Sequence, residues 1–391
     1  MSQSSAAGAS ARDAFDWYVP RSGFVMTHRG QGVVVDGPAT ALLSVAPGPD
    51  QVTRAAATAR DALAAAAEHS VIVGALPFDG TPVAFLQVAG PLVHVDAAAA
   101  RDDIDVPAFR VLHTAHEPDE AAYEDAVAEV LRSIDAGAAE KVVLARTLVI
   151  ESDTTLDPAL IASRLAAADP DCHVFAAALP GGAHALVGAS PEMLVRRRGD
   201  RVASDPLAGS AARSQDGSED RDRADALLRS VKDRREHRLV AEAVAETLAP
   251  YCTALDVAAQ PSLLATATLW HLHTAIRGRL HADAPDALSL AAALHPTPAV
   301  CGTPRDAALA RIRELEPFDR RFYAGIVGWV DASGDGEWVI ALRCAEVSGR
   351  TARLYAGAGI VAGSEPEAED RETDVKFEAM LRALGADQSA R

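Results

Sequence analysis

The sequence predicts an α+β fold (an α/β sandwich) in which helices flank a large core of antiparallel β-sheet. Three observations support this fold class. Apolar runs come in blocks joined by turn residues, most clearly in the meander over residues 325–361. Helical segments stand between these blocks instead of following every strand. Hydrophobic residues make up 49% of the 391 residues, which is enough for one large domain or two ordinary ones.

The N-terminal quarter is expected to contain a leader, short strands and one helix. Residues 1–14 are mostly small and polar, which predicts a disordered leader without the apolar segment of a signal peptide. Short apolar runs then predict strands and hairpins, and an alanine-rich helix is expected over residues 51–69. A connection containing Pro and Asp at residues 96–107 separates an N-terminal part, 15–104, from the remainder, 105–388, which we assign to the same domain.

The remainder is expected to combine amphipathic helices with buried strands. Tyr123 and Val127 recur with helical spacing, and Gly137 suits the end of that helix. Thr303 before Pro304 is typical of an N-cap followed by proline at the first helical position. The predicted elements are a helix at 119–136, a strand at 141–150, a helix at 157–168, strands at 173–179 and 184–197, and a long charged helix at 219–248.

The stretch from residue 354 to residue 376 runs from an apolar strand through glycines into an acidic helix. Gly357 and Gly359 carry no Cβ, so a ligand can approach the backbone closely there. Ser364 and Glu367 match a capping box, which predicts that the helix begins at this serine. The stretch therefore predicts a ligand-contacting strand followed by a helix.

Two predicted helices each present carboxylates on one face. Glu369, Glu372 and Lys376 occupy positions i, i+3 and i+7 of the C-terminal helix, and Asp233 and Glu236 are three residues apart in the long charged helix. Brought together, the two pairs would offer the oxygen ligands that Mg²⁺ prefers, and the lysine would attract an anion. For either pair by itself, a solvated helix face with ordinary ion pairs is the better explanation.

Four further residues have types that suit catalysis or ligand binding. Lys141 opens an apolar strand, where burial can turn a lysine into a base. Glu192 stands in a turn after a strand, where burial can keep its carboxyl protonated for general-acid catalysis. Arg343 lies in an apolar strand and needs an anionic partner, and His271 is better explained as a pocket residue than as a zinc ligand. The ordinary alternatives are solvated Lys and Glu side chains and an arginine paired with a structural carboxylate.

Composition and charge argue against several classes of protein. The formal net charge of −18 is unfavourable for general nucleic-acid binding and for anionic membranes. The four cysteines show no CxxC spacing, which argues against a zinc site and a disulfide framework and suits a reducing compartment. The sequence has no uninterrupted run of about 18 apolar residues, so no membrane span is predicted. We therefore expect a cytoplasmic protein, and a monomer is the simplest assembly.

Nine segments, in a fixed order, are typical of one enzyme family. They are EKVVLAR, GASPEML, DPLAGSAARS, SVKDRREH, LWHLHT, LHPTPAVCGTP, ELEPFDRRFYAGIVGW, IALRCA, and LYAGAGIV with the later DRETDVK. On these segments the sequence resembles the chorismate-binding enzymes, and the resemblance covers roughly residues 105–385. It looks most similar to the stand-alone isochorismate synthases.

The resemblance implies a reaction and roles for the charged residues. It implies a Mg²⁺-dependent, reversible conversion of chorismate to isochorismate. Lys141 would activate the water that attacks C2, and Glu192 would protonate the departing C4 hydroxyl. Both roles require pKa values shifted by burial. The implied metal ligands, direct or through water, are Glu236, Glu372, Asp233 and Glu369.

The resemblance also implies a substrate pocket. Chorismate is a dianion, so an acidic protein needs Mg²⁺ and a local cationic set to hold it. Val300 departs from the siderophore-pathway enzymes, which commonly have a bulkier leucine there. The implied substrate-binding residues are Gly209, Ser210, His271, Ala299, Val300, Arg343, Gly357, Gly359 and Lys376.

Small features distinguish the reactions within the family. Aminodeoxychorismate synthases typically carry a nucleophilic lysine where this chain has Ala208. Anthranilate synthases typically have an amidotransferase partner, and no such subunit is expected here. The HPTPA segment favours the isochorismate-forming group, with a product used for 2,3-dihydroxybenzoate siderophores or for menaquinone. The alternatives are a salicylate synthase, which goes on to eliminate pyruvate, and a non-catalytic chorismate-binding homologue.

Overall fold

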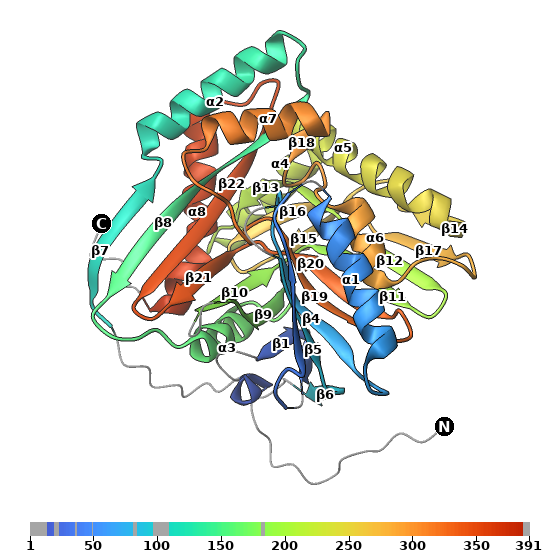
Figure 1. The fold of residues 1–391 in the computed structure, drawn as a ribbon. Coiled ribbons are helices and arrows are strands. Elements are labelled where there is room, and N and C mark those ends of the chain that lie inside the picture. Colours follow the sequence, from blue (N-terminus) through green and yellow to red (C-terminus); the bar gives the residue numbers. More distant parts are fainter. Residues whose placement is uncertain are drawn as a thin grey trace.

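The computed structural model describes residues 14–18, 23–35, 37–48, 50–80, 84–96, 109–180 and 184–385. Within these ranges the strands form one sheet of ten strands, one of nine and a small one of three (Figure 1). Every pairing between described strands is antiparallel, as between β8 and β22 or between β19 and β20. The predicted α+β class with a large antiparallel core is confirmed. The predicted leader, apart from Ala14, and the predicted connection, apart from Asp96, lie outside the described residues.

The first sheet combines strands from both ends of the chain. Its central pair is β8 and β22, which run side by side from Lys141 opposite Val361 to Glu151 opposite Thr351. Nearly all of β8 is buried, as expected for a strand covered on both faces. In sheet order the strands are β18 Gly302–Thr303, β8 Lys141–Ser152, β22 Thr351–Val361, β21 Cys344–Ser348, β10 His184–Ser190, β9 His173–Ala178, β1 Phe24–His28, β2 Gln31–Val35 and β6 Leu92–Asp96, and β7 Val111–Glu117 also pairs with β8.

The second sheet likewise mixes N-terminal and C-terminal strands. In order it contains β14 Cys252–Val257, β17 Ile276–Leu280, β12 Arg201–Asp205, β11 Met193–Arg198, β20 Gly336–Ile340, β19 Ile326–Asp331, β4 Val71–Leu76, β5 Ala84–Ala89 and β3 Ala41–Val45. The small third sheet contains β13 Leu207–Ala212, β16 Leu269–His273 and β15 Ser262–Ala265.

The helices cover the sheets and supply two hydrophobic clusters. One cluster joins side chains of both large sheets with those of α1, α2, α6 and α7, and the other joins the first sheet with α3 and α8. No helix in the described part of the chain is both long and apolar enough to cross a bilayer. The helices are α1 Gln51–Ala65, α2 Glu120–Asp135, α3 Pro158–Ala168, α4 Gly217–Arg229, α5 Val231–Leu248, α6 Ala287–Leu294, α7 Arg305–Leu315 and α8 Pro366–Leu384, with short 3₁₀ turns η1 Ala14–Trp17 and η2 Ala249–Tyr251.

Two of the points at which the chain passes between the two large sheets are neighbours. The chain leaves β10 in the first sheet and enters β11 in the second through Pro191 and Glu192. It returns from β20 to β21 through residues 341–343. Backbone hydrogen bonds link the crossings: Ile340 N donates to Glu192 O, and Ala189 N donates to Arg343 O. The single strand predicted over 184–197 is therefore wrong, because proline and the change of sheet divide it.

The predicted long helix over 219–248 is also wrong. It is divided at Ser230, which ends α4 and whose Oγ accepts a hydrogen bond from Asp233 N, so a new helix begins at Val231. Serine competes with the helix for backbone hydrogen bonds, and here the competition produces a second N-cap.

Two predicted helix starts need correction. Ser364 does not cap α8: its Oγ accepts a hydrogen bond from Val361 N, and the helix begins at Pro366 after Glu365. The helix after Thr303 begins at Arg305, and Pro304 occupies the N-cap position instead of the first helical position. Both errors are small, because the predicted charged faces of the helices are unaffected by a shift in the first residue.

Candidate active site

A narrow pocket lies where these two sheet crossings meet β8, β22, the third sheet and the helices α5 and α8. Its free volume is about 70 Å³. Six lining residues were not among the predicted site residues: Val143, Pro191, Leu207, Ala208, Tyr323 and Leu342. The predicted residues that line it are Glu192, Gly209, Ser210, Glu236, His271, Ala299, Val300, Arg343, Gly357, Gly359, Glu372 and Lys376.

Glu192 lies at the first sheet crossing and is 3% exposed. Its backbone N–H donates to Ser190 Oγ, which holds the turn in place. Burial raises the pKa of its carboxyl to about 8, although a backbone hydrogen bond from Leu207 and the charges of Lys141 and Arg343 act in the opposite direction. A carboxylic acid with this pKa is protonated at neutral pH, so Glu192 has the state that a general acid needs.

Arg343 lies at the second crossing, with its guanidinium facing the same pocket. Its backbone φ of 47° is unusual for a residue other than glycine, and such strain is common at functional sites. Burial lowers the pKa of the guanidinium. No hydrogen bond or ion pair to this guanidinium is formed by side chains of the described residues, so it is the natural anion-binding group of the pocket.

Lys141 begins β8 and is completely buried. Its Nζ lies 2.9 Å from Oε1 of Glu236 on α5. A nearby position on β22, opposite Val143, must be glycine, because a Cβ at Gly359 would lie 2.2 Å from Glu236 Oε1 and 3.0 Å from Lys141 Cε. The glycine thus makes room for the ion pair next to the pocket.

Glu372 and Lys376 form an ion pair one turn apart on α8, with Oε1 and Nζ 2.5 Å apart. Lys376 Nζ also donates to Gly357 O at 2.7 Å, and Ser210 Oγ donates to Glu372 Oε1 at 3.0 Å. Burial opposes ionisation of Glu372, but Lys376 and the hydrogen bond from Ser210 hold the pKa of this carboxyl below its usual value. Glu372 is therefore an ionised carboxylate at the pocket wall.

Glu369 and Asp233 stand beside the pocket instead of lining it. Glu369 is 1% exposed, and its Oε1 lies 2.7 Å from Lys232 Nζ. Asp233 adjoins Gly209, because a Cβ on that glycine would lie 3.0 Å from Asp233 Cβ. Burial raises the pKa of both carboxyls, and repulsion by neighbouring carboxylates adds to it. The predicted acidic residues thus share one neighbourhood, and the nearest groups to three of them are lysines.

His271 on β16 lies opposite Ser210 on β13. A register shift at Gly209, whose φ is 76°, turns this part of β13 toward the pocket. Burial lowers the pKa of His271 well below its usual value, and the charges of Arg343 and Lys376 lower it further. The imidazole is therefore neutral and can exchange hydrogen bonds with a polar ligand.

The residues that sequence reasoning missed have weak local signals. Val143 could have been found, since it stands two residues after Lys141 on a strand and so shares its face. Leu342 precedes Arg343 in the crossing, and Tyr323 lies in the loop before β19, where no periodicity indicates its direction. Lys232 was overlooked because a charged residue at the start of a helix usually faces solvent.

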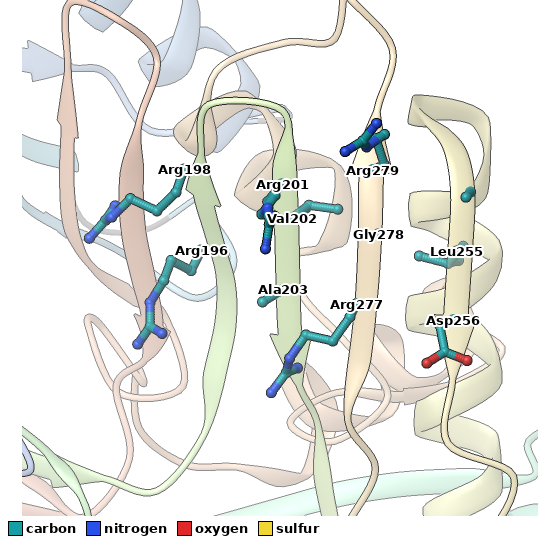
Figure 2. Close-up of a pocket in the computed structure, with 11 residues that line it drawn as sticks. Arg196, Arg198, Arg201, Val202, Ala203, Leu255, Asp256, Arg277, Gly278 and Arg279 are labelled. Atoms are coloured by element: carbon teal, nitrogen blue, oxygen red, sulfur yellow. The ribbon is translucent and has the colours of Figure 1, made fainter.

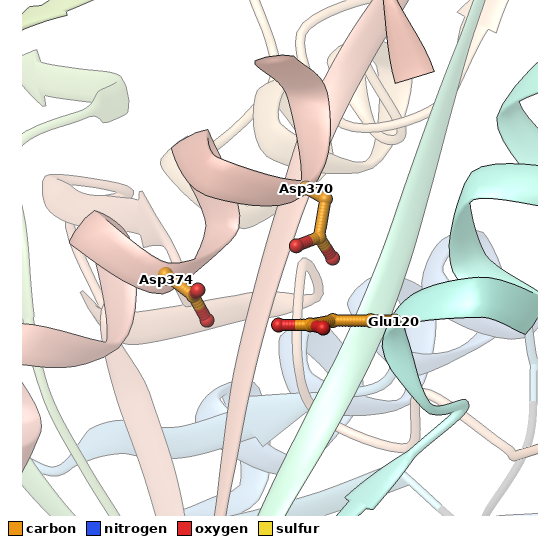
Figure 3. Close-up of side chains that lie close together, drawn as sticks. All are labelled: Glu120, Asp370 and Asp374. Carbon is orange, nitrogen blue, oxygen red and sulfur yellow. The ribbon is translucent and has the colours of Figure 1, made fainter. Parts of the chain in front are cut away.

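A second group of carboxylates lies outside this pocket. One oxygen from each of Glu120, Asp370 and Asp374 falls within 4.8 Å of the others, a geometry that could hold a metal ion. Figure 3 shows Glu120 at the start of α2 facing the two aspartates on α8. Arg146 already compensates this group, because its Nη1 lies 3.0 Å from Asp370 Oδ1 and its Nη2 lies 2.5 Å from Asp374 Oδ1.

A larger hollow of about 570 Å³ lies on the outer face of the second sheet. Figure 2 shows that its arginines come from neighbouring strands β11, β12 and β17. Most of them pair with acidic neighbours, as Arg196 does with Glu337 and Arg277 with Asp205. Among the described residues that line this hollow, the only acidic one is the exposed Asp256.

Comparison with known proteins agrees with this geometry. A family model described as chorismate binding enzyme matches residues 94–385. The isochorismate synthase DhbC of Bacillus subtilis (strain 168) is 44% identical over 345 residues, covering 85% of each chain. The isochorismate synthase EntC of Escherichia coli (strain K12) is 41% identical over 334 residues, covering 84% of this chain and 85% of that protein.

Solved structures have the same fold. The crystal structure of DhbC from Bacillus anthracis superposes with a TM-score of 0.87 at 39% identity, covering 96% of this chain and 99% of that one. MenF, the menaquinone-specific isochorismate synthase of Escherichia coli, gives a TM-score of 0.77 at 28% identity, covering 96% and 92%. By its matched residues, its identity to these relatives and its fold, this chain belongs to the chorismate-binding enzyme family.

Proposed function

We propose that this protein is an isochorismate synthase, an isomerase that converts chorismate to isochorismate. The observation that carries the proposal is the presence of two buried groups at and beside one pocket: Glu192, whose pKa is about 8, lines it, and Lys141 at the start of β8 stands next to it against Glu236. Arg343 adds a cationic group to the pocket lining. The names of the relatives, which share more than 40% of their residues with this chain, support the same activity.

The chain's own residues account for each proton in this reaction. Arg343 and Lys376 bind the carboxylates of chorismate and orient the ring. Lys141 accepts a proton from the water that bonds to C2, and the double bonds shift as the C4 oxygen departs. Glu192 gives its proton to that oxygen, which leaves as water. One water enters and one leaves, and the proton taken up by Lys141 returns to Glu192 through solvent before the next turnover. The net change is therefore an isomerisation without redox chemistry.

We propose Mg²⁺ as the cofactor, held by Glu236 and Glu372, with Asp233 and Glu369 acting directly or through water. The donor set fits, since it consists of carboxylate oxygens, which Mg²⁺ prefers. Buried carboxylates that raise one another's pKa gain from a divalent cation between them. When bound, the cation supplies positive charge that neutralises a substrate carboxylate at the pocket wall.

The cellular setting is proposed from the same comparisons. The names of the relatives support a role in making a 2,3-dihydroxybenzoate siderophore, with menaquinone, for which MenF is named, as the alternative. We propose a cytoplasmic monomer that uses no amidotransferase subunit and has no nucleic-acid or membrane partner. We further propose that residues 15–104 and 105–388 form one domain, which the mixing of N-terminal and C-terminal strands in both large sheets supports.

Product identification tests the proposed reaction. Purified protein is incubated with chorismate and Mg²⁺, and the products are separated by liquid chromatography with mass detection. Isochorismate, reaching an equilibrium mixture with chorismate from either side, is the expected product. Salicylate and pyruvate formed without a second enzyme would instead identify a salicylate synthase, and binding of chorismate without any product would identify a non-catalytic homologue.

A further inference from the structure

Lysine is scarce in this chain and occurs only at the candidate site. Of the 37 lysine and arginine residues, Lys141, Lys232 and Lys376 are the only lysines. Arginine's planar fork suits fixed, bidentate pairs, whereas lysine carries a compact charge that can leave one partner for another. Each lysine Nζ lies close to a different carboxylate of the proposed metal set: Lys141 to Glu236 at 2.9 Å, Lys232 to Glu369 at 2.7 Å and Lys376 to Glu372 at 2.5 Å.

The three lysines differ in their freedom to move. The side chain of Lys141 is fully buried, and that of Lys376 is 10% exposed and also tied to Gly357 O. The side chain of Lys232 is 34% exposed, whereas that of its partner Glu369 is 2% exposed. Lys232 can therefore turn into solvent, whereas Glu369 stays buried and needs another positive charge in place of the ammonium group.

The position of Lys232 is the one that a cation would compete for. Its Nζ bridges from α5 to α8 and donates to Glu369 Oε1 at 2.7 Å. The pocket itself has only about 70 Å³ of free volume, whereas pockets for small ligands commonly span roughly 300–1,000 Å³. Little room is therefore left for a cation beside the paired side chains. Of the three lysines that pair with the proposed metal ligands, Lys232 has the most exposed side chain.

We propose that Lys232 is the counterion that a divalent cation displaces from Glu369, so that this ion pair lowers the metal affinity of the site. The inference rests on the proposed Mg²⁺ site. In the protein without bound metal, the ammonium group compensates the buried carboxylates and stabilises the fold. When the cation binds, it takes over this compensation and Lys232 turns to solvent. Lys232 is thus a positioning residue that sets how tightly the metal is held.

Mg²⁺ titration of Lys232→Gln tests the proposal without measuring turnover. By isothermal titration calorimetry the variant is expected to bind Mg²⁺ about tenfold more tightly than the wild type, because its competitor is gone. In EDTA the variant is expected to unfold at a lower temperature, and saturating Mg²⁺ is expected to raise its Tm by more than it raises that of the wild type. A lysine with only a structural role would lower Tm equally with and without Mg²⁺.

Arg238→Gln is the matched control. It removes one positive charge from the same helix, at a residue whose side chain is 63% exposed and pairs only loosely with Glu242. Its Mg²⁺ affinity and its Tm shift are expected to equal those of the wild type. Lys232→Arg, which keeps the charge, is expected to bind Mg²⁺ no more tightly than the wild type.

Two outcomes would overturn the inference, and they can be told apart. If the wild type binds Mg²⁺ and Lys232→Gln binds it equally or more weakly, Lys232 does not compete with the metal, and the proposed metal site still stands. If the wild type shows no Mg²⁺ binding by calorimetry, the proposed metal site fails and the inference fails with it.

Discussion

Two clusters of buried charge lie on neighbouring stripes of α8 and are built in different ways. The pocket stripe carries Glu369 and Glu372, whose partners are lysines. The other stripe carries Asp370 and Asp374, whose partner is Arg146 of β8. The first cluster opens into a pocket, whereas the second joins β8 and α8.

The side chain of Arg146 has further contacts besides its two ion pairs. Its Nε donates to Thr373 Oγ1 at 2.6 Å, and its guanidinium carbon lies 5.6 Å from the ring of Tyr123 and 5.9 Å from that of Phe377. A guanidinium with fork geometry and aromatic neighbours makes a fixed structural link. At the pocket, Lys141 and Lys232 each pair with one carboxylate, and Lys376 pairs with Glu372 and with Gly357 O. Arginine thus fixes the structural cluster through several contacts, whereas lysine supplies compact charges to the carboxylates of the pocket cluster.

Lys141→Ala breaks the pocket cluster most severely. We expect kcat to fall by about 10²–10⁴-fold, since the proposed base is removed. Mg²⁺-dependent binding of chorismate, measured by calorimetry, is expected to remain. Undiminished turnover would show that another group activates the water, and loss of the folded near-UV circular dichroism signal would show that Lys141 is chiefly structural.

Arg146→Met breaks the structural cluster instead. It leaves Asp370 buried without its counterion, which is expected to cost about 3–5 kcal/mol of unfolding free energy in urea denaturation. Mg²⁺ should not restore this loss, and kcat of the folded fraction should change little. The control is Arg350→Met, which breaks an ion pair whose two side chains are each 49% exposed and should cost less than about 1 kcal/mol. Equal costs for both variants would contradict the distinction between the clusters.

The pH dependence of turnover is the prediction with the smallest expected effect, and it tests Glu192 in the pocket. Glu192 must be protonated to act as an acid, and its pKa is about 8, so kcat should fall about tenfold per pH unit above that value. Because the pKa of Glu192 is raised in the folded protein, the free energy of unfolding decreases as pH rises from 4.5, the ordinary pKa, to about 8. Above pH 8 this group causes no further decrease. Loss of activity between pH 8 and 9.5 should therefore occur without unfolding. A flat profile in this range, measured beside circular dichroism, would contradict the assignment of Glu192 as the acid.

Much of the chemistry could be predicted from residue types and spacing. Asp233 and Glu236, like Glu369 and Glu372, stand three residues apart, and helical geometry places each pair on one side of its helix. Lys141 at the start of an apolar strand was recognisable for the same local reason. The antiparallel class followed from runs of strands joined by short turns, which require hairpins.

Other features depended on contacts between distant segments. The strand predicted over 184–197 divides because Pro191 and Glu192 pass between sheets, and no periodicity encodes a change of sheet. The helix break at Ser230 depends on the hydrogen bond that its hydroxyl accepts from Asp233 N. A serine hydroxyl can form several alternative hydrogen bonds with nearby backbone groups, so the residue type alone does not predict this one.

By itself the sequence determined which groups are available: the acidic pairs, the cationic residues, the glycines and the helical or strand pattern that carries them. Only the tertiary structure decided which of these groups are buried, and therefore which have shifted pKa values. It also decided with which carboxylate each lysine forms an ion pair. The reason is that desolvation and Coulomb energy depend on distances in space. Segments more than 100 residues apart, such as those carrying Lys232 and Glu369, set these distances when the chain folds.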